Sequence, residues 1–290
     1  MGDIFLTDMA QWLRQEGLVI IEYDGWQTRA RGSGGYDDMP LCVMWHHTAS
    51  TSDGWDDAQY IAENAQDAPL SNLYIDRSGT VWVLAAGATN TNGKGKSIRF
   101  SRGTVPENSM NSRAVGVEMG NNGKGERWPQ AQVDAMFIVS NCMNLHLGNQ
   151  PDDLATHHFY SGSVQGKIDP ATTNIEGPWV PRAVNASGSW DCKDVMDECV
   201  RRANGVYPIE DDDMWIGPYL IQATGKDGHE SGAVFATDGR MMTVRRLRTP
   251  EELDGYRWTM TNYGISAPEL QPGAPIVPID TIGAYGVVIE

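Results

Sequence analysis

Four of the six histidines form two doublets, His46-His47 and His157-His158. Each doublet ends a segment whose apolar and β-branched residues predict a strand. Zinc in catalytic sites takes three protein ligands, such as neutral imidazole and carboxylate, and keeps a fourth position for water. Because adjacent strand residues point to opposite faces of a sheet, only one histidine of each doublet can reach a shared ion. A doublet by itself is more often one core and one surface histidine. Neighbouring motifs must therefore decide whether these doublets form a metal site.

The elements that must position these residues mix strands and helices. Strands are predicted at 18–23, 41–47, 114–119 and 154–158, with a β-hairpin at 72–85. Helices are predicted at 6–16, from Pro129 to Gly148, and near 190–204, with a long loop between about 159 and 187. The strand at 18–23 is expected to be buried because it is continuously apolar. The pattern predicts an α/β fold in which helices cover both faces of a mixed central β-sheet.

Composition narrows the classes of function. The 290 residues are 40% hydrophobic and 21% charged, which is typical of a globular protein. A formal net charge of −16 opposes non-specific binding to nucleic acid or to anionic membranes. No apolar run is long enough to span a membrane, and the first residues lack the pattern of a signal peptide, so we expect synthesis in the cytoplasm. The cysteines are expected to be buried thiols: Cys42, Cys142, Cys192 and Cys199.

The chain is expected to contain two domains. An acidic run from Glu210 to Asp213 predicts a solvated linker at 206–213, which separates a domain at 1–205 from a smaller one at 214–290. In the second domain, strands are predicted at 219–224, in a hairpin at 233–244 and at 274–279, and Thr249-Pro250-Glu251-Glu252 predicts the start of a helix. We therefore expect a small α+β or β-rich C-terminal domain.

Three motifs, in this order and spacing, carry a family resemblance: WHHTAS at 45–50, AVGVEMGNNG at 114–123 and GKIDPA at 166–171. Together they resemble the type 2 N-acetylmuramoyl-L-alanine amidases, which are relatives of phage lysozyme-amidases and of the peptidoglycan recognition proteins. The resemblance covers roughly residues 10–204 and is greatest to endolysins of actinobacterial phages. It implies a Zn²⁺ cofactor and peptidoglycan as the substrate.

The resemblance also implies a ligand set for the zinc ion. The family motif HxTA selects His46 over His47 as the first ligand, and the family's lysine–aspartate–proline stretch supplies Asp169 as the third. For the second ligand the match of HHFYS to the family pattern favours His157, with His158 as the alternative. Residues 157 to 169 are about two positions further apart than the commoner family spacing.

Two further residues are implied to act in catalysis. Glu118 stands where the family has a glutamate that accepts a proton from the zinc-bound water. Lys167 matches the family lysine and would place a positive charge beside the oxyanion. From the residues alone, Glu118 could instead be an edge glutamate and Lys167 a solvated loop lysine. The family's NHAG-like stretch corresponds to Asn90-Thr91-Asn92-Gly93, which lacks the histidine. We interpret that missing histidine as a peripheral substrate contact.

The resemblance implies hydrolysis of the amide bond between N-acetylmuramic acid and L-alanine. Two alternatives remain: a binding module that does not cut peptidoglycan, and a zinc peptidase that cuts within the stem peptide. Without a signal peptide, an endolysin would stay in the host cytoplasm until a holin-type lesion in the membrane gives it access to the cell wall. The oligomeric state and the chemistry of the stem peptide are left open.

We predict that the isolated segment 206–290 folds and binds host cell walls. Four arginines cluster around its predicted hairpin: Arg240, Arg245, Arg246 and Arg248. Because the planar guanidinium group suits contact with carboxylate or phosphate, this stripe is a plausible docking face on an acidic domain, although the same arginines could simply neutralise nearby acids. Wall binding should weaken as salt rises. Co-sedimentation with purified walls measures it, and a folded fragment that stays in the supernatant at low salt would contradict it.

Overall fold

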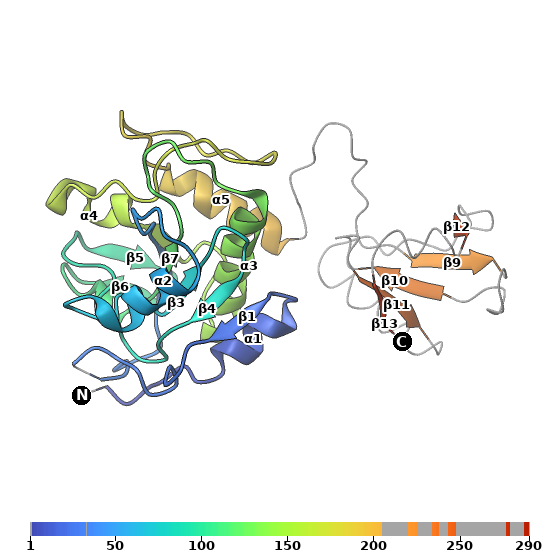
Figure 1. Cartoon of the computed structure of the whole chain (residues 1–290), viewed down its shortest axis with the longest axis horizontal. Helices are drawn as coiled ribbons and strands as arrows, with labels where there is room; N and C mark the ends of the chain where they lie inside the picture. Colours follow the sequence, from blue (N-terminus) through green and yellow to red (C-terminus); the bar gives the residue numbers. More distant parts are fainter. Residues whose placement is uncertain are drawn as a thin grey trace. The chain divides into compact units, whose positions relative to one another are not determined.

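The protein is described here from a computed structural model, in which the chain divides into two compact units, Met1–Pro208 and Ile209–Glu290 (Figure 1). The structure describes residues 2–32 and 34–204, and in the second unit the backbone of five strands. The predicted acidic linker at 206–213 lies outside the described residues. Each unit is therefore considered by itself.

A six-stranded mixed sheet forms the centre of the first unit. Its strands lie in the order β1-β4-β3-β7-β2-β8. They are β1 (Ile20–Glu22), β4 (Val81–Val83), β3 (Leu73–Ile75), β7 (Ala114–Met119), β2 (Cys42–Trp45) and β8 (Leu154–Thr156). Strands β3 and β4 form the predicted hairpin and pair antiparallel, while every other neighbouring pair is parallel. The prediction of a mixed central sheet is confirmed.

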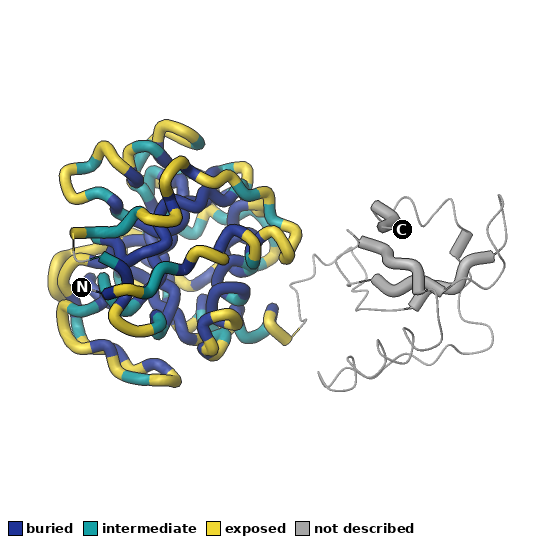
Figure 2. The backbone as a smooth tube through the Cα atoms, turned by 90° about the horizontal axis from the view of Figure 1, so that it is seen from below, coloured by how far each residue is buried: buried dark blue, intermediate teal, exposed yellow. Residues whose placement is uncertain are grey.

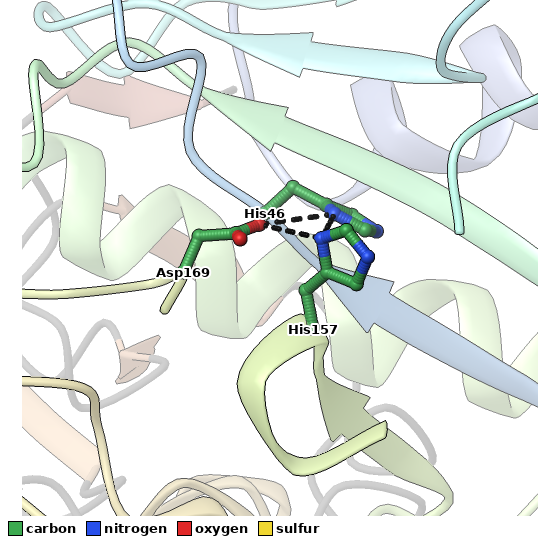
Figure 3. Close-up of side chains that lie close together, drawn as sticks. All are labelled: His46, His157 and Asp169. Carbon is green, nitrogen blue, oxygen red and sulfur yellow. Dashed lines mark hydrogen bonds and ion pairs between the residues drawn. The ribbon is translucent and has the colours of Figure 1, made fainter. Parts of the chain in front are cut away.

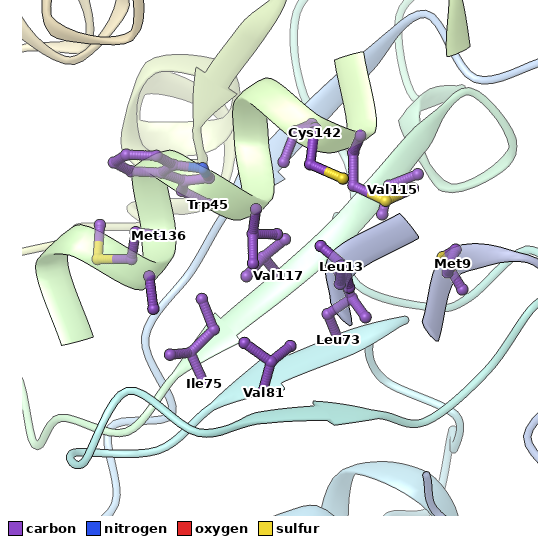
Figure 4. Packing of buried hydrophobic residues seen from close by; sticks show 14 of the residues in the cluster. Met9, Leu13, Trp45, Leu73, Ile75, Val81, Val115, Val117, Met136 and Cys142 are labelled. Atoms are coloured by element: carbon purple, nitrogen blue, oxygen red, sulfur yellow. The ribbon is translucent and has the colours of Figure 1, made fainter. Parts of the chain in front are cut away.

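One face of this sheet packs against α1 (Met9–Gln15) and α3 (Gln130–Leu147), with α5 (Cys192–Ala203) beside α3. Alternate strand residues point into this layer, where Trp45 and Val117 meet Met136 of α3 (Figure 4). The indole Nε1 of Trp45 also donates a hydrogen bond to Ser140 Oγ at 2.7 Å. The helix predicted from Pro129 to Gly148 is thus confirmed, and Gly148 ends it in the left-handed conformation.

The opposite face is covered by shorter elements, most of which the sequence did not predict. They are α2 (Trp55–Gln59), the π-helical turn Tyr60–Asn64, the hairpin of β5 (Ile98–Phe100) with β6 (Gly103–Val105), the 3-10 turn Met110–Ser112 and α4 (His157–Gln165). Met44 and Ala155 of the sheet pack against Phe100 and Tyr160 on this side. Figure 2 shows that the buried segments run through the interior of the unit, with exposed residues on the loops around them. Helices therefore lie on both faces, as predicted.

Two expectations for the first unit were wrong. The strand predicted at 18–23 is not buried: β1 lies at the edge of the sheet, and Ile21 and Glu22 are exposed. The strand predicted at 154–158 ends at Thr156, and His157 begins helix α4 in place of the predicted loop. The Thr156 side chain accepts a hydrogen bond from Phe159 N and so caps this helix.

In the second unit the five described strands form one sheet in the order β12-β9-β10-β11-β13. They are β12 (Val277–Pro278), β9 (Leu220–Thr224), β10 (Val234–Thr237), β11 (Thr243–Leu247) and β13 (Val287–Ile289). Strands β10 and β11 pair antiparallel, as the predicted hairpin requires. The helix predicted after Thr249 lies outside the described residues, as do the side chains of the four clustered arginines.

The four cysteines are all buried and free, as expected. Among the helices that the structure describes, none is long and apolar enough to cross a membrane.

Asn72 is a buried polar residue that ties the sheet to the segment 85–89. Its amide Nδ2 donates to the carbonyls of Ala85 at 2.9 Å and Gly87 at 2.8 Å. Its Oδ1 accepts from Gly116 N of β7 at 2.9 Å, and also from Tyr36 Oη and Thr89 Oγ1. Every hydrogen-bonding position of the side chain is therefore used. The segment that it holds leads directly to residues 90–93, where Thr91 packs on Gly116 of β7.

We predict that Asn72→Ala lowers the free energy of unfolding by about 3 kcal/mol or more, because it leaves several buried backbone groups without partners. Urea unfolding followed by tryptophan fluorescence measures the change. Asn174→Ala is the control, since its Nδ2 bonds Gly125 O at an exposed position, and it should cost less than about 1 kcal/mol. A similar small cost for Asn72→Ala would show that this network is not important for stability.

Candidate metal centre

Three residues from distant parts of the chain meet in one buried cluster, His46, His157 and Asp169 (Figure 3). The Nδ1 atoms of the two histidines are 2.9 Å apart. Asp169 Oδ2 is 3.2 Å from Nδ1 of His46 and 2.9 Å from Nδ1 of His157. All three residues are at most 8% exposed. Among the described residues this is the one group whose ligand atoms lie close enough together to share a metal ion.

Strand register brings these residues together. Trp45 of β2 is paired with Thr156 of β8 on one side and with Val117 of β7 on the other. The residues that follow this row are His46, His157 and Glu118. Because the three strands are parallel, their carboxyl ends meet at the same edge of the sheet. Asp169 reaches the same edge from a loop, and its carbonyl accepts a hydrogen bond from His158 N at 2.8 Å.

The electrostatics of the cluster suit a cation. Burial opposes ionisation of Asp169, but the neighbouring His157 and His46 rings outweigh it and hold the pKa of Asp169 well below its usual value. Burial, together with the neighbouring His157, lowers the pKa of His46 to about 4. At neutral pH the cluster therefore combines an ionised Asp169 carboxylate with a neutral His46 ring. These are the protonation states in which the two groups can bind a metal ion.

The donor set and its spacing fit zinc. Two imidazole nitrogens and one carboxylate oxygen are a ligand set that catalytic zinc uses, with a fourth position left for water. Metal–ligand distances of about 2.0–2.2 Å place tetrahedral ligands about 3.3–3.6 Å from one another. The separations of 2.9 to 3.2 Å within the cluster are a few tenths of an ångström shorter than this range. The residues present thus fit a tetrahedral ion with little rearrangement.

The second histidine of each doublet points elsewhere. The ring of His47 lies near Trp128, and its Nδ1 accepts a hydrogen bond from Ala171 N at 3.3 Å. Nδ1 of His158 donates to the carbonyl of Lys167 at 2.7 Å. The structure therefore brings His46 and His157 to the cluster and leaves His47 and His158 outside it. The assignment of His46 and His157 as metal ligands stays a prediction.

Glu118 stands on β7 beside the cluster. Its Oε2 atom is enclosed and has no hydrogen-bond partner. Burial, reinforced by the negative charge of Asp169, raises the pKa of Glu118 well above its ordinary value, while the positive charge of Lys167 acts in the opposite direction. An unpartnered carboxyl group with a raised pKa is the kind of group that can exchange protons during a reaction.

Lys167 is exposed, two residues before Asp169. Its positive charge acts to lower the pKa of Glu118, so the two groups lie within electrostatic range of each other. No hydrogen bond of its ammonium group to Glu118 or to the cluster is present among the described residues.

Sequence reasoning misses the importance of Asn92, because it considers only the histidine that the stretch Asn90–Gly93 lacks. Asn92 is buried and lies against both histidine rings. Its Oδ1 is 3.0 Å from Nε2 of His46, and its main-chain oxygen is 3.2 Å from Nε2 of His157. The family comparison within the sequence gave no signal for this residue, because the contact joins segments 46 and 65 positions apart.

Comparison with known proteins identifies the family of this region. Residues 36–172 match the N-acetylmuramoyl-L-alanine amidase family, which confirms the resemblance seen in the motifs. This range contains the buried cluster, Glu118 and Asn92. No curated protein matches the chain in sequence.

Several solved structures resemble the chain over about half of its length. The endolysin amidase LysCS from Clostridium intestinale is 20% identical, with 54% of this chain and 88% of that chain covered and a TM-score of 0.37. The amidase AmiD from E. coli, in complex with a muropeptide substrate, is 16% identical, with coverages of 52% and 60% and a TM-score of 0.38. Drosophila PGRP-LB is 13% identical, with coverages of 48% and 82% and a TM-score of 0.35.

Proposed function

With residues 36–172 matching the N-acetylmuramoyl-L-alanine amidase family, we propose that the protein is a zinc-dependent amidase of the endolysin type. Its substrate is peptidoglycan, and the bond that it hydrolyses is the amide between the lactyl group of N-acetylmuramic acid and L-alanine. The observation that carries this proposal is the buried cluster of two histidines and one aspartate inside the matched region. His46, His157 and Asp169 would hold the ion.

A bound Zn²⁺ ion supplies Lewis-acid chemistry, polarising a carbonyl group and lowering the pKa of a water molecule. The protein groups around it have separate tasks. Glu118 accepts the proton of the attacking water at a carboxylate oxygen and returns it to the leaving amine of L-alanine. Its enclosed position supports this role, because burial makes the carboxylate a stronger base than a solvated one. Lys167 contributes positive charge on the side where the oxyanion develops.

The two alternatives are distinguished by chemistry. A binding module that does not cut peptidoglycan has no need of a complete ligand set or of a buried general base, so the presence of both favours the enzyme. A zinc peptidase would use similar ligands but would cut between amino acids of the stem peptide. The chemical groups that appear when peptidoglycan is digested therefore distinguish an amidase, a peptidase and a binding module.

We predict one zinc ion per chain, lost in His46→Ala and Asp169→Ala. Because Nδ1 of His157 is in the cluster and His158 points to Lys167, His157→Ala should lose zinc while the matched variant His158→Ala keeps it. Metal analysis of the purified variants, together with circular dichroism to confirm folding, makes the comparison. Retention of full zinc by a folded His157→Ala protein would remove His157 from the site.

We predict that digestion of purified peptidoglycan produces new L-alanine amines matched by free lactyl carboxyl groups, detected by mass spectrometry. Glu118→Gln should keep zinc and fold but lose about 10²–10⁴-fold in turnover, because the amide cannot take up the proton. New ends within the stem peptide would instead identify a peptidase, and the absence of any new end would favour the binding module. Turnover by Glu118→Gln like that of the wild type would exclude Glu118 as the base.

A further inference from the structure

One residue contacts both histidine rings of the cluster from the side opposite Asp169. Each ring presents Nδ1 to the cluster and Nε2 to Asn92. The side-chain oxygen of Asn92 faces His46, and its main-chain oxygen faces His157. Both atoms are acceptors only, so each histidine must donate from Nε2.

We propose that Asn92 is a positioning residue that holds both histidines in the Nε2-protonated tautomer, with the Nδ1 lone pairs directed at the metal position. This inference rests on the proposed zinc site. A neutral imidazole carries one proton, on either nitrogen, and the hydrogen bond made by the other nitrogen decides which one binds metal. Without an acceptor behind the ring, the Nδ1-protonated tautomer could donate to Asp169 inside the cluster. That tautomer cannot bind an ion through Nδ1.

The chain around Asn92 is fixed on three sides. Its N–H donates to Asn111 Oδ1 at 2.7 Å, in the 3-10 turn. The preceding Thr91 packs so closely on Gly116 of β7 that a Cβ atom there would lie 2.4 Å from Thr91 Oγ1. On the other side, Lys94 N donates to Gln165 Oε1 at 2.7 Å, at the end of the helix that begins with His157. The acceptors are therefore held in place independently of any metal ion.

The amide group of Asn92 is used on one side only. Oδ1 contacts His46, whereas Nδ2 is buried and has no hydrogen-bond partner. A side chain that only filled space or tied the loop together would have no reason to bury an unpaired amide. The orientation of the Asn92 side chain therefore serves its Oδ1 atom, which contacts His46, and leaves Nδ2 unpaired. It also means that an aspartate at this position would lose no hydrogen bond.

The test compares three variants by zinc affinity, measured in competition with a chromophoric chelator. Asn92→Ala removes the acceptor and should weaken zinc binding by about 10–100-fold, the range typical of a group behind a ligand. Asn92→Asp keeps the acceptor and should stay within about threefold of the wild type. Asn90→Ala is the matched control, because Asn90 is in the same loop as Asn92. Its Nδ2 bonds Asp67 O, away from both rings, so zinc affinity should not change.

A second measurement does not depend on zinc. Nitrogen-15 NMR of the metal-free wild-type protein should show His46 and His157 protonated at Nε2, and Asn92→Ala should shift His46 towards the other tautomer. The Nδ1-protonated tautomer in the wild type would overturn the inference even if Asn92→Ala failed to fold. Wild-type zinc affinity in Asn92→Ala would also overturn it, as would equal losses in Asn92→Ala and Asn92→Asp. In these cases the zinc site stands if His46→Ala still abolishes binding, so the two proposals fail separately.

Discussion

The parallel pairing of β7, β2 and β8 is the constraint on which the site depends. One row of the sheet, Thr156, Trp45 and Val117, sets the register of all three strands. The next position on each strand carries a polar residue of the site. A slip by one residue would turn every side chain of a strand to the other face, moving His46 into the layer where Trp45 packs on α3. The apolar core on one face therefore fixes the polar cluster on the other.

Two asparagines show how polar groups buried beside the sheet are paired, although Asn92 Nδ2 and Glu118 Oε2 have no partner. Asn72 uses all of its hydrogen-bonding positions on backbone and hydroxyl groups. The carbonyl and amide oxygens of Asn92 satisfy the outer nitrogens of the two histidine rings. The segment between these asparagines passes over β7, where Gly116 leaves room for Thr91. The stability of the sheet and the geometry of the buried cluster thus depend on one connected set of contacts.

Two carboxyl groups in the same site have opposite electrostatic surroundings. The two neighbouring histidine rings lower the pKa of Asp169 despite burial, while Glu118 has an enclosed oxygen without a partner and a raised pKa. Groups of one chemical type whose pKa values are driven apart can take different tasks. The opposite pKa shifts support Asp169 as a carboxylate that stays ionised and could bind a metal ion, and Glu118 as the group that exchanges protons.

The sequence by itself determined the strands of the sheet, the long helix α3 and the residue types of the site, because hydrophobic periodicity and short motifs are local properties. It could not show that His157 starts a helix, since Thr156 can cap that helix only because β8 ends at this residue. It also could not separate the members of a doublet on the residues alone, nor find Asn92. Those results depend on contacts between segments that strand register and loop packing bring together, and no local pattern encodes such contacts. The tertiary structure decided them through hydrogen-bond geometry in a buried space.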